Sequence, residues 1–204
     1  MTTVTRLFDS HTEALDAVSK LESSGVHHDK ISIVSNNADN WHSGSRDHKA
    51  GPLGDRNGDG ENDVADGAGK GATTGGLLGA GAGVLAGLGP VVAAGWLAST
   101  AVGAAVGAAA GGATGGLLGA LKESGHSDEE ANVYSEGVRR GGTLVSVKAD
   151  GDEAQQIQAI LDGSRGYDAA TRGEAYRQSG WSGFDADAKP YTSEQILEER
   201  ARYR

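Results

Sequence analysis

The sequence predicts an α+β fold: a ferredoxin-like βαβ-βαβ sandwich, with four strands and two helices on one face, split after its second strand by an inserted antiparallel helical hairpin. Strand and helix patterns alternate on both sides of the insertion. Residues 71–121 contain no Asp, Glu, Lys or Arg. The predicted segments are residues 1–36 and 123–172 for the two halves of the sandwich, 37–66 for a polar Gly/Asp/Asn-rich loop, 67–122 for the hairpin and 173–204 for an aromatic and charged arm.

The first half of the sandwich has the pattern of a βαβ unit. Residues 3–8 alternate polar and apolar side chains, as a half-buried strand does. Ser10 and Glu13 have the spacing of a capping box, which starts a helix, and Gly25 ends that helix. A second strand is predicted at residues 30–35.

The second half repeats this order. Ser127 and Glu130 form another capping box, and the helix that it starts closes at Gly141 and Gly142. The elements predicted after that helix are a strand at residues 143–149, a helix at about residues 151–162 and a short edge strand near residues 167–170. These elements make a second βαβ unit, which completes the sandwich.

The uncharged insertion carries glycine at every fourth position, in two series. Residues four apart share one face of a helix, so each series would give that face a stripe without side chains, along which another backbone packs closely. Each glycine inside a helix costs about 1 kcal/mol relative to alanine, and only such packing would offset this cost. The series are Gly71, Gly75, Gly79, Gly83 and Gly87, then Gly103, Gly107, Gly111, Gly115 and Gly119, with Gly95 and Ser99 extending the second series backwards.

This glycine zipper predicts self-association, because a hairpin buries only one side of each helix and leaves its leucines and valines exposed. A second interpretation places the hairpin in or on a lipid bilayer. Residues 71–88 would form a helix of about 27 Å, just short of a hydrocarbon core of about 30 Å. Lys70 and Lys122 flank the hairpin, as they would if only its turn entered the bilayer.

Composition and motifs exclude several functions. A net charge of −10 and a pI near 5.0 argue against a nucleic-acid partner. The absence of cysteine excludes disulfides and thiol catalysis, and residues 1–9 have no secretory signal, so we expect a cytoplasmic protein. The sequence contains no Ser/His/Asp order, phosphate-binding loop or dinucleotide fingerprint, which predicts a non-enzymatic protein without a cofactor.

One motif before the hairpin resembles a calcium-binding loop. It has oxygen-bearing side chains at positions 1, 3, 5, 9 and 12 and glycine at position 6. Position 8 is polar instead of aliphatic, however, and position 12 is aspartate instead of the longer glutamate. A solvated Asn/Asp/Gly turn is the favoured interpretation, with calcium as the alternative. The candidate ligands are Asp55, Asn57, Asp59, Asp63 and Asp66.

The C-terminal arm contains Trp181, Phe184 and Tyr191, which are too sparse to form a core of their own. We expect these aromatic residues to dock into a groove on this domain, on a neighbouring copy or on another protein. The alternative is a charged tail without fixed structure. A terminal helix is predicted at residues 193–204.

Two further stretches are distinctive: Gly89-Pro90-Val91-Val92-Ala93-Ala94-Gly95-Trp96-Leu97 and Val133-Tyr134-Ser135-Glu136-Gly137-Val138-Arg139-Arg140-Gly141-Gly142-Thr143-Leu144-Val145. Together with the zipper, they resemble bacterial general stress proteins of the heat- and stress-induced YflT-like family. The resemblance covers about residues 2–172. It implies a cytoplasmic bacterial protein induced by heat, salt, cold or desiccation, and it implies no reaction and no catalytic residues. The sequence therefore predicts a non-enzymatic stress-response protein that self-associates through its hairpin.

Overall fold

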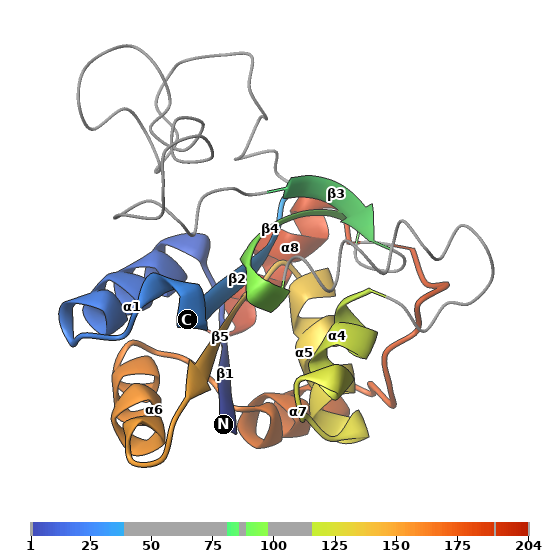
Figure 1. Cartoon of the computed structure of the whole chain (residues 1–204). Helices are drawn as coiled ribbons and strands as arrows, with labels where there is room; N and C mark the ends of the chain where they lie inside the picture. The colour runs from blue at the N-terminus through green and yellow to red at the C-terminus, as the bar shows by residue number, and fades with distance from the viewer. Residues whose placement is uncertain (1, 39–80, 86–88, 98–115, 190, 204) are drawn as a thin grey trace, which may run out of the picture.

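The computed structural model describes residues 2–38, 81–85, 89–97, 116–189 and 191–203, and it has a mixed α+β architecture (Figure 1). The described strands are β1 (Thr2–Phe8), β2 (Ile31–Asn36), β3 (Gly81–Leu85), β4 (Gly89–Gly95) and β5 (Thr143–Ala149). The described helices are α1 (His11–Ser23), a 3-10 turn η1 (His28–Lys30), α4 (Leu117–Glu123), α5 (Asp128–Arg139), α6 (Glu153–Gly163), α7 (Ala169–Gln178) and α8 (Ser193–Arg202).

The strands form one antiparallel sheet in the order β1-β5-β2-β4-β3. Because β5 lies between β1 and β2 and is antiparallel to both, β1 and β2 run parallel to each other. Helix α6 then carries the chain from β5 to Tyr167, which forms an antiparallel bridge with Leu7 on the outer side of β1. The two βαβ segments are therefore interleaved, each with a strand of the other inside it.

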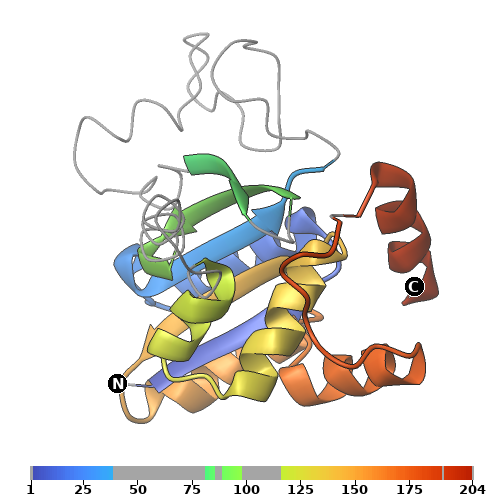
Figure 2. The same ribbon diagram turned by 90° about the vertical axis from the view of Figure 1, so that its right-hand side faces the viewer.

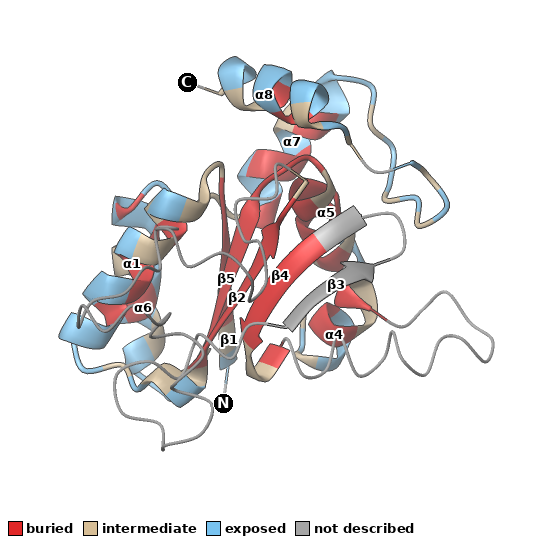
Figure 3. Ribbon diagram, turned by 90° about the horizontal axis from the view of Figure 1, so that it is seen from above, coloured by how far each residue is buried: buried red, intermediate tan, exposed pale blue. Residues whose placement is uncertain are grey.

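Helices cover both faces of the sheet, so the molecule has three layers (Figures 1 and 2). Helices α1 and α6 pack on one face, and α4, α5 and α7 lie on the other. Figure 3 shows that β2, most of β5 and residues 91–94 of β4 are buried. The two helices of the predicted sandwich, α1 and α6, do share one face, but the predicted two-layer arrangement is wrong because α4, α5 and α7 cover the other face. The physical reason is that Leu144 on β5 faces one core while Val145 and Val147 face the other, and both apolar faces require a cover.

Most elements of the two halves are confirmed. Ser10 caps α1 by accepting a hydrogen bond from the Glu13 amide, and Ser127 and Glu130 form the predicted capping box of α5. The short edge strand predicted at residues 167–170 is wrong beyond Tyr167. The side chain of Asp168 accepts a hydrogen bond from the Thr171 amide at 2.7 Å, and this cap starts α7 at Ala169.

The predicted helical hairpin is wrong over β3 and β4, which pair with each other as a β-hairpin. Gly83 lies in β3 and Gly95 ends β4. Residues 91–94 are buried between the helix layers and pair with β2, so an uninterrupted apolar run that resembles a helix is here a strand buried on both faces. Gly95 has a φ of +85°, and a Cβ there would collide with the Ile31 carbonyl oxygen, so only glycine fits where the chain leaves the sheet.

The last predicted zipper glycine, Gly119, lies in α4, where the helix prediction is confirmed. Leu117, Ala120 and Leu121 of this helix are buried in the same core as α5. None of the helices in the described ranges is long and apolar enough to span a bilayer. The zipper positions outside the described residues are Gly71, Gly75, Gly79, Gly87, Gly103, Gly107, Gly111 and Gly115, together with Ser99.

Candidate functional site

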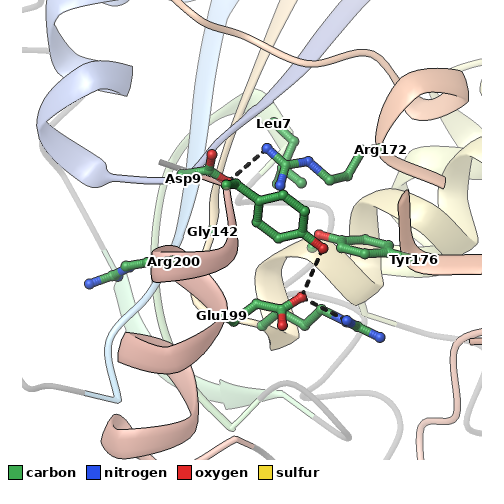
Figure 4. A pocket seen from close by; sticks show the side chains of 10 residues that line it. Leu7, Asp9, Gly142, Arg172, Tyr176, Glu199 and Arg200 are labelled. Atoms are coloured by element: carbon green, nitrogen blue, oxygen red, sulfur yellow. Dashed lines mark hydrogen bonds and ion pairs between the residues drawn. The ribbon is translucent and has the colours of Figure 1, made fainter. Parts of the chain in front are cut away.

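A cluster of charged side chains lies where α5, α7 and α8 meet the end of the sheet, at the junctions that follow β1 and precede β5 (Figure 4). The cavity that remains among these side chains is about 10 Å³, which is room for about one water molecule. The side chains therefore fill the site themselves. Its lining residues are Leu7, Asp9, Gly137, Arg140, Gly142, Arg172, Tyr176, Glu199, Arg200 and Tyr203.

At the centre of the cluster a fully buried carboxylate, Glu136 of α5, binds two arginines of the same helix. Arg139 donates to its Oε2 and Oε1 atoms at 2.8 and 2.7 Å, and Arg140 donates to Oε1 at 2.6 Å. Spacings of three and four residues on one helix make these contacts. Arg140 also donates from Nη1 to Glu199 Oε1 of α8 at 2.7 Å. Burial would lower the pKa of Arg140, but its hydrogen bonds to Glu199 and Glu136 outweigh burial and raise it.

A third arginine, Arg172 of α7, has a side chain that is 2% exposed. Its Nη2 atom lies 2.8 Å from Asp9 Oδ1, just beyond the end of β1. Its guanidinium lies 4.0 Å from the ring centroid of Tyr167 and 4.3 Å from that of Tyr203. The charge is thus held between two aromatic faces, each of which attracts a cation.

Arg140 has a similar aromatic environment. Its guanidinium lies 4.3 Å from the ring centroid of Tyr176 and 5.8 Å from that of Tyr191, while the guanidinium of Arg139 lies 4.8 Å from the Tyr191 centroid. Tyr176 is almost completely buried, and burial raises the pKa of its hydroxyl, so the ring is neutral at physiological pH. Each of Arg140 and Arg172 is thus covered by one tyrosine from the globular body and one from the chain end.

The aromatic residues predicted to dock all lie against the chain's own body. Trp181 and Phe184 pack on the core that includes α5. The ring of Trp181 meets that of Tyr176 edge-on at 5.8 Å, and the Phe184 amide donates to Asn132 Oδ1 at 3.2 Å. Tyr191 lies over the arginines of α5, as described above.

Away from the arginine cluster, His126 lies in the loop between α4 and α5, next to β1. The Nε2 atom of His126 is 2.8 Å from the Thr5 hydroxyl, which donates to Ser146 Oγ at 2.9 Å. Nδ1 lies 3.9 Å from Glu130 Oε2. This order of acid, imidazole and hydroxyl is that of a nucleophilic triad, but Thr5 is 2% exposed and its oxygen is enclosed between strands. We interpret His126, Thr5 and Ser146 as a buried hydrogen-bond network that joins the loop to the sheet.

The candidate calcium ligands Asp55, Asn57, Asp59, Asp63 and Asp66 lie outside the described residues. Within the residues that the structure describes, no three His, Cys, Asp or Glu side chains are grouped so as to hold a metal ion.

Comparison of the chain with protein-family models, with curated proteins and with solved structures finds no match. The class of the protein is therefore given by its own fold and site. It is an α+β protein with a three-layer core and a buried network of arginines, carboxylates and tyrosines that fastens its terminal helix.

Sequence reasoning missed the principal residues of this network: Glu136, Arg140, Arg172, Glu199 and Tyr203. A usable signal existed in α5. Glu136 stands between the core residues Tyr134 and Val138, with arginines three and four residues later. A carboxylate between two core positions of a helix, with cations at that spacing, indicates a buried ion pair. No comparable local signal marks Arg172 or Glu199.

Proposed function

We propose that this chain is a non-enzymatic bacterial general stress-response protein that acts by self-association. The resemblance to the YflT-like family supports the stress-response part. The non-enzymatic part is supported by the described polar cluster, in which Arg140, Glu136 and Glu199 bind one another and the residual cavity holds about one water. We further propose a ferredoxin-like head, supported by the interleaved segments β1-α1-β2 and β5-α6-Tyr167.

The observation that carries self-association is the position of β3 at the edge of the sheet. Among the described strands β3 pairs only with β4, so one side of its backbone has no partner strand there. Residues 81–83 read Gly-Ala-Gly and lack the charged side chains or prolines that protect sheet edges. We propose that β3 of one copy pairs with β3 of a second. In this proposal the uncharged segment associates as a strand over β3, and the glycine zipper is kept for the stretches outside the described residues.

Two single proline substitutions test this pairing. Successive residues of a strand direct their amides to opposite sides, so one of Ala82 and Gly83 donates toward β4 and the other toward the free edge. We expect one of Ala82→Pro and Gly83→Pro to weaken folding, and the other to reduce association by at least tenfold while leaving the melting temperature within a few degrees. Sedimentation across a concentration series measures association. If both folded variants associate like the parent, pairing through β3 is wrong.

Membrane association is a second candidate function, and the absence of acidic and basic residues from residues 71–121 favours it. The position of α4 limits how much of that stretch is available to lipid, because Leu117 and Leu121 are committed to the core with α5. Flotation of the full chain with anionic and zwitterionic vesicles distinguishes the candidates. A defined oligomer that stays out of the lipid fraction supports self-association, and quantitative flotation supports membrane association.

A further inference from the structure

The chain end, here called the terminal segment (residues 191–203), contributes to the arginine cluster in the way that a bound peptide would. The body supplies Arg140 stacked on Tyr176 and Arg172 stacked on Tyr167, two half-sites that we call the arm site. The terminal segment completes each half-site with its own side chains. It adds the rings of Tyr191 and Tyr203 and, between them, the carboxylate of Glu199.

Two further hydrogen bonds join the terminal segment to the body: Arg200 Nη2 donates to the Gly141 carbonyl oxygen at 2.9 Å, and Ser193 Oγ donates to that of Ala38 at 3.1 Å. Of the ten residues of α8 only Ile196 and Glu199 are buried, and Leu197 is 64% exposed. Ile196 sits directly over Gly141, where a Cβ would collide with its side chain. Figure 2 shows α8 set apart from the three layers, and Figure 3 shows that its outer surface is largely exposed. A terminal helix with so little burial opens at a lower free energy than the core does.

The buried charges at this contact make it selective. With the terminal segment removed, Arg140 keeps Glu136 but loses the carboxylate on its Nη1 atom, and Arg172 keeps Asp9 but loses the ring of Tyr203. A buried Nη1 group without its hydrogen-bond partner is costly, whereas the Glu199 carboxylate satisfies it. The arm site therefore selects a segment in which tyrosine, glutamate and tyrosine are spaced as they are at 191, 199 and 203.

We propose that the arm site is a peptide-binding site whose intermolecular ligand is the terminal segment of a second copy of this chain. This inference rests on the proposed self-association and names a further contact within it. A second copy carries the required Tyr, Glu and Tyr spacing, and exchange preserves every contact seen within one chain. With Trp181 and Phe184 held on the core, residues 185–190 form a six-residue tether that spans up to about 20–22 Å.

None of the described residues that line the arm site belongs to β3, so pairing through β3 would leave the arm site available for exchange of the terminal segment between copies. Binding of the terminal segment to the arm site of the other copy then competes with its binding to the arm site of its own chain. The copies bound in this way share two contacts of different chemistry: a backbone ladder at one edge of the sheet and charged, aromatic contacts at the arm site.

The test uses the full chain and a fluorescent peptide of residues 191–203. The full-length Glu199→Gln variant loses the charge that holds its own segment, so its arm site is more often free. We expect the peptide to bind this variant at least tenfold more tightly than it binds the parent chain. The same peptide carrying Glu199→Gln should bind the variant at least tenfold more weakly than the unmodified peptide does. Fluorescence anisotropy measures both affinities.

Glu198→Gln is the matched control, because Glu198 is the exposed neighbour of Glu199 and the substitution changes the net charge equally. In either the chain or the peptide it should leave binding within twofold. A second full-length variant, Ile196→Ala, releases α8 without changing any charge, and it should also bind the unmodified peptide more tightly than the parent does. If neither folded variant binds the peptide, or if the Glu198→Gln peptide weakens as much as the Glu199→Gln peptide, the inference is overturned.

The proline variant that loses association at β3 separates this inference from the proposed function. When Glu199→Gln is added to that variant, the peptide should still bind, because the described lining of the arm site contains no residue of β3. Peptide binding without association of the parent chain would overturn the proposed function alone. Association through β3 without peptide binding would overturn the arm site alone.

Discussion

At the scale of single residues, glycine sets how closely α5 approaches the sheet. Gly137 and Gly142 both face Leu7, at the junction where α5 turns back into β5. A Cβ at Gly142 would lie 2.8 Å from the Gly137 carbonyl oxygen and 3.1 Å from that of Phe8. Backbone atoms cannot yield in the way that a flexible side chain can. This close approach places Arg140 beside the end of β1, where the arginine cluster forms.

We predict that Gly142→Ala lowers the free energy of unfolding by about 1–3 kcal/mol, because the added methyl group overpacks a site walled by backbone. Gly163→Ala is the matched control, since a Cβ at that position in α6 meets nothing within 4 Å. It should leave stability unchanged or raise it by about 0.5–1 kcal/mol through helix propensity. Urea denaturation measures both variants. Equal stability of the two would contradict the packing argument.

At the scale of elements, two helices with the same kind of cap have different roles. Helix α5 packs against β1, β2 and β5 and is buried along most of its length, whereas α8 buries two residues. Each begins with a capping box: Ser127 with Glu130 in α5, and Thr192 with Gln195 in α8. The two capping boxes make the same kind of hydrogen bonds. A difference between the effects of removing them therefore shows how strongly each helix is coupled to the core.

Removing each cap should therefore have a different consequence. Ser127→Ala should lower the global free energy of unfolding by about 1 kcal/mol. Thr192→Ala should leave global unfolding nearly unchanged and instead speed hydrogen exchange within α8, which opens on its own. Thermal melts and amide exchange measured on the same samples would separate the two effects. A global loss from Thr192→Ala as large as that from Ser127→Ala would show that α8 folds as part of the core.

At the scale of the whole molecule, His126 couples the fold to pH. Its ring joins the loop before α5 to Thr5 of β1, and it packs edge-on against Tyr134 at a centroid distance of 5.6 Å. Burial lowers the pKa of His126 below its ordinary value of 6.5, although nearby Glu130 acts in the opposite direction. The folded chain therefore resists protonation of this ring more than the unfolded chain does.

The sign of the pH dependence follows from this difference. Between the lowered pKa of the folded state and the ordinary value of 6.5, the unfolded chain binds more protons. The contribution of His126 to stability should thus be complete above about pH 6.5 and should decrease as the pH falls below it. Unfolding of the parent and of His126→Gln, compared at pH 7.5 and pH 5, measures the contribution. A parent that loses no more stability than the variant on acidification would contradict it.

Local patterns in the sequence predicted much of the fold, because a cap or a strand is specified by residues close together in the chain. The caps at Ser10 and Ser127 and the strands β1, β2 and β5 follow from such patterns. The error over β3 and β4 also has a local cause. Gly79, Gly81 and Gly83 alternate with alanines in a two-residue period, while glycine also recurs every fourth residue. A stretch of only glycine and alanine fits both the two-residue period of a strand and the four-residue spacing of a helix face.

The sequence by itself determined the α+β class, the first βαβ unit and the helix boundaries set by caps, because these depend on neighbouring residues. Only the tertiary structure decided that residues 89–95 are a strand, since pairing with β2 supplies the backbone partners that make extended chain favourable there. It alone also brought Arg140 and Glu199, 59 positions apart, into contact. An ion pair at that separation has no periodicity to reveal it, because its geometry exists only after the helices have packed.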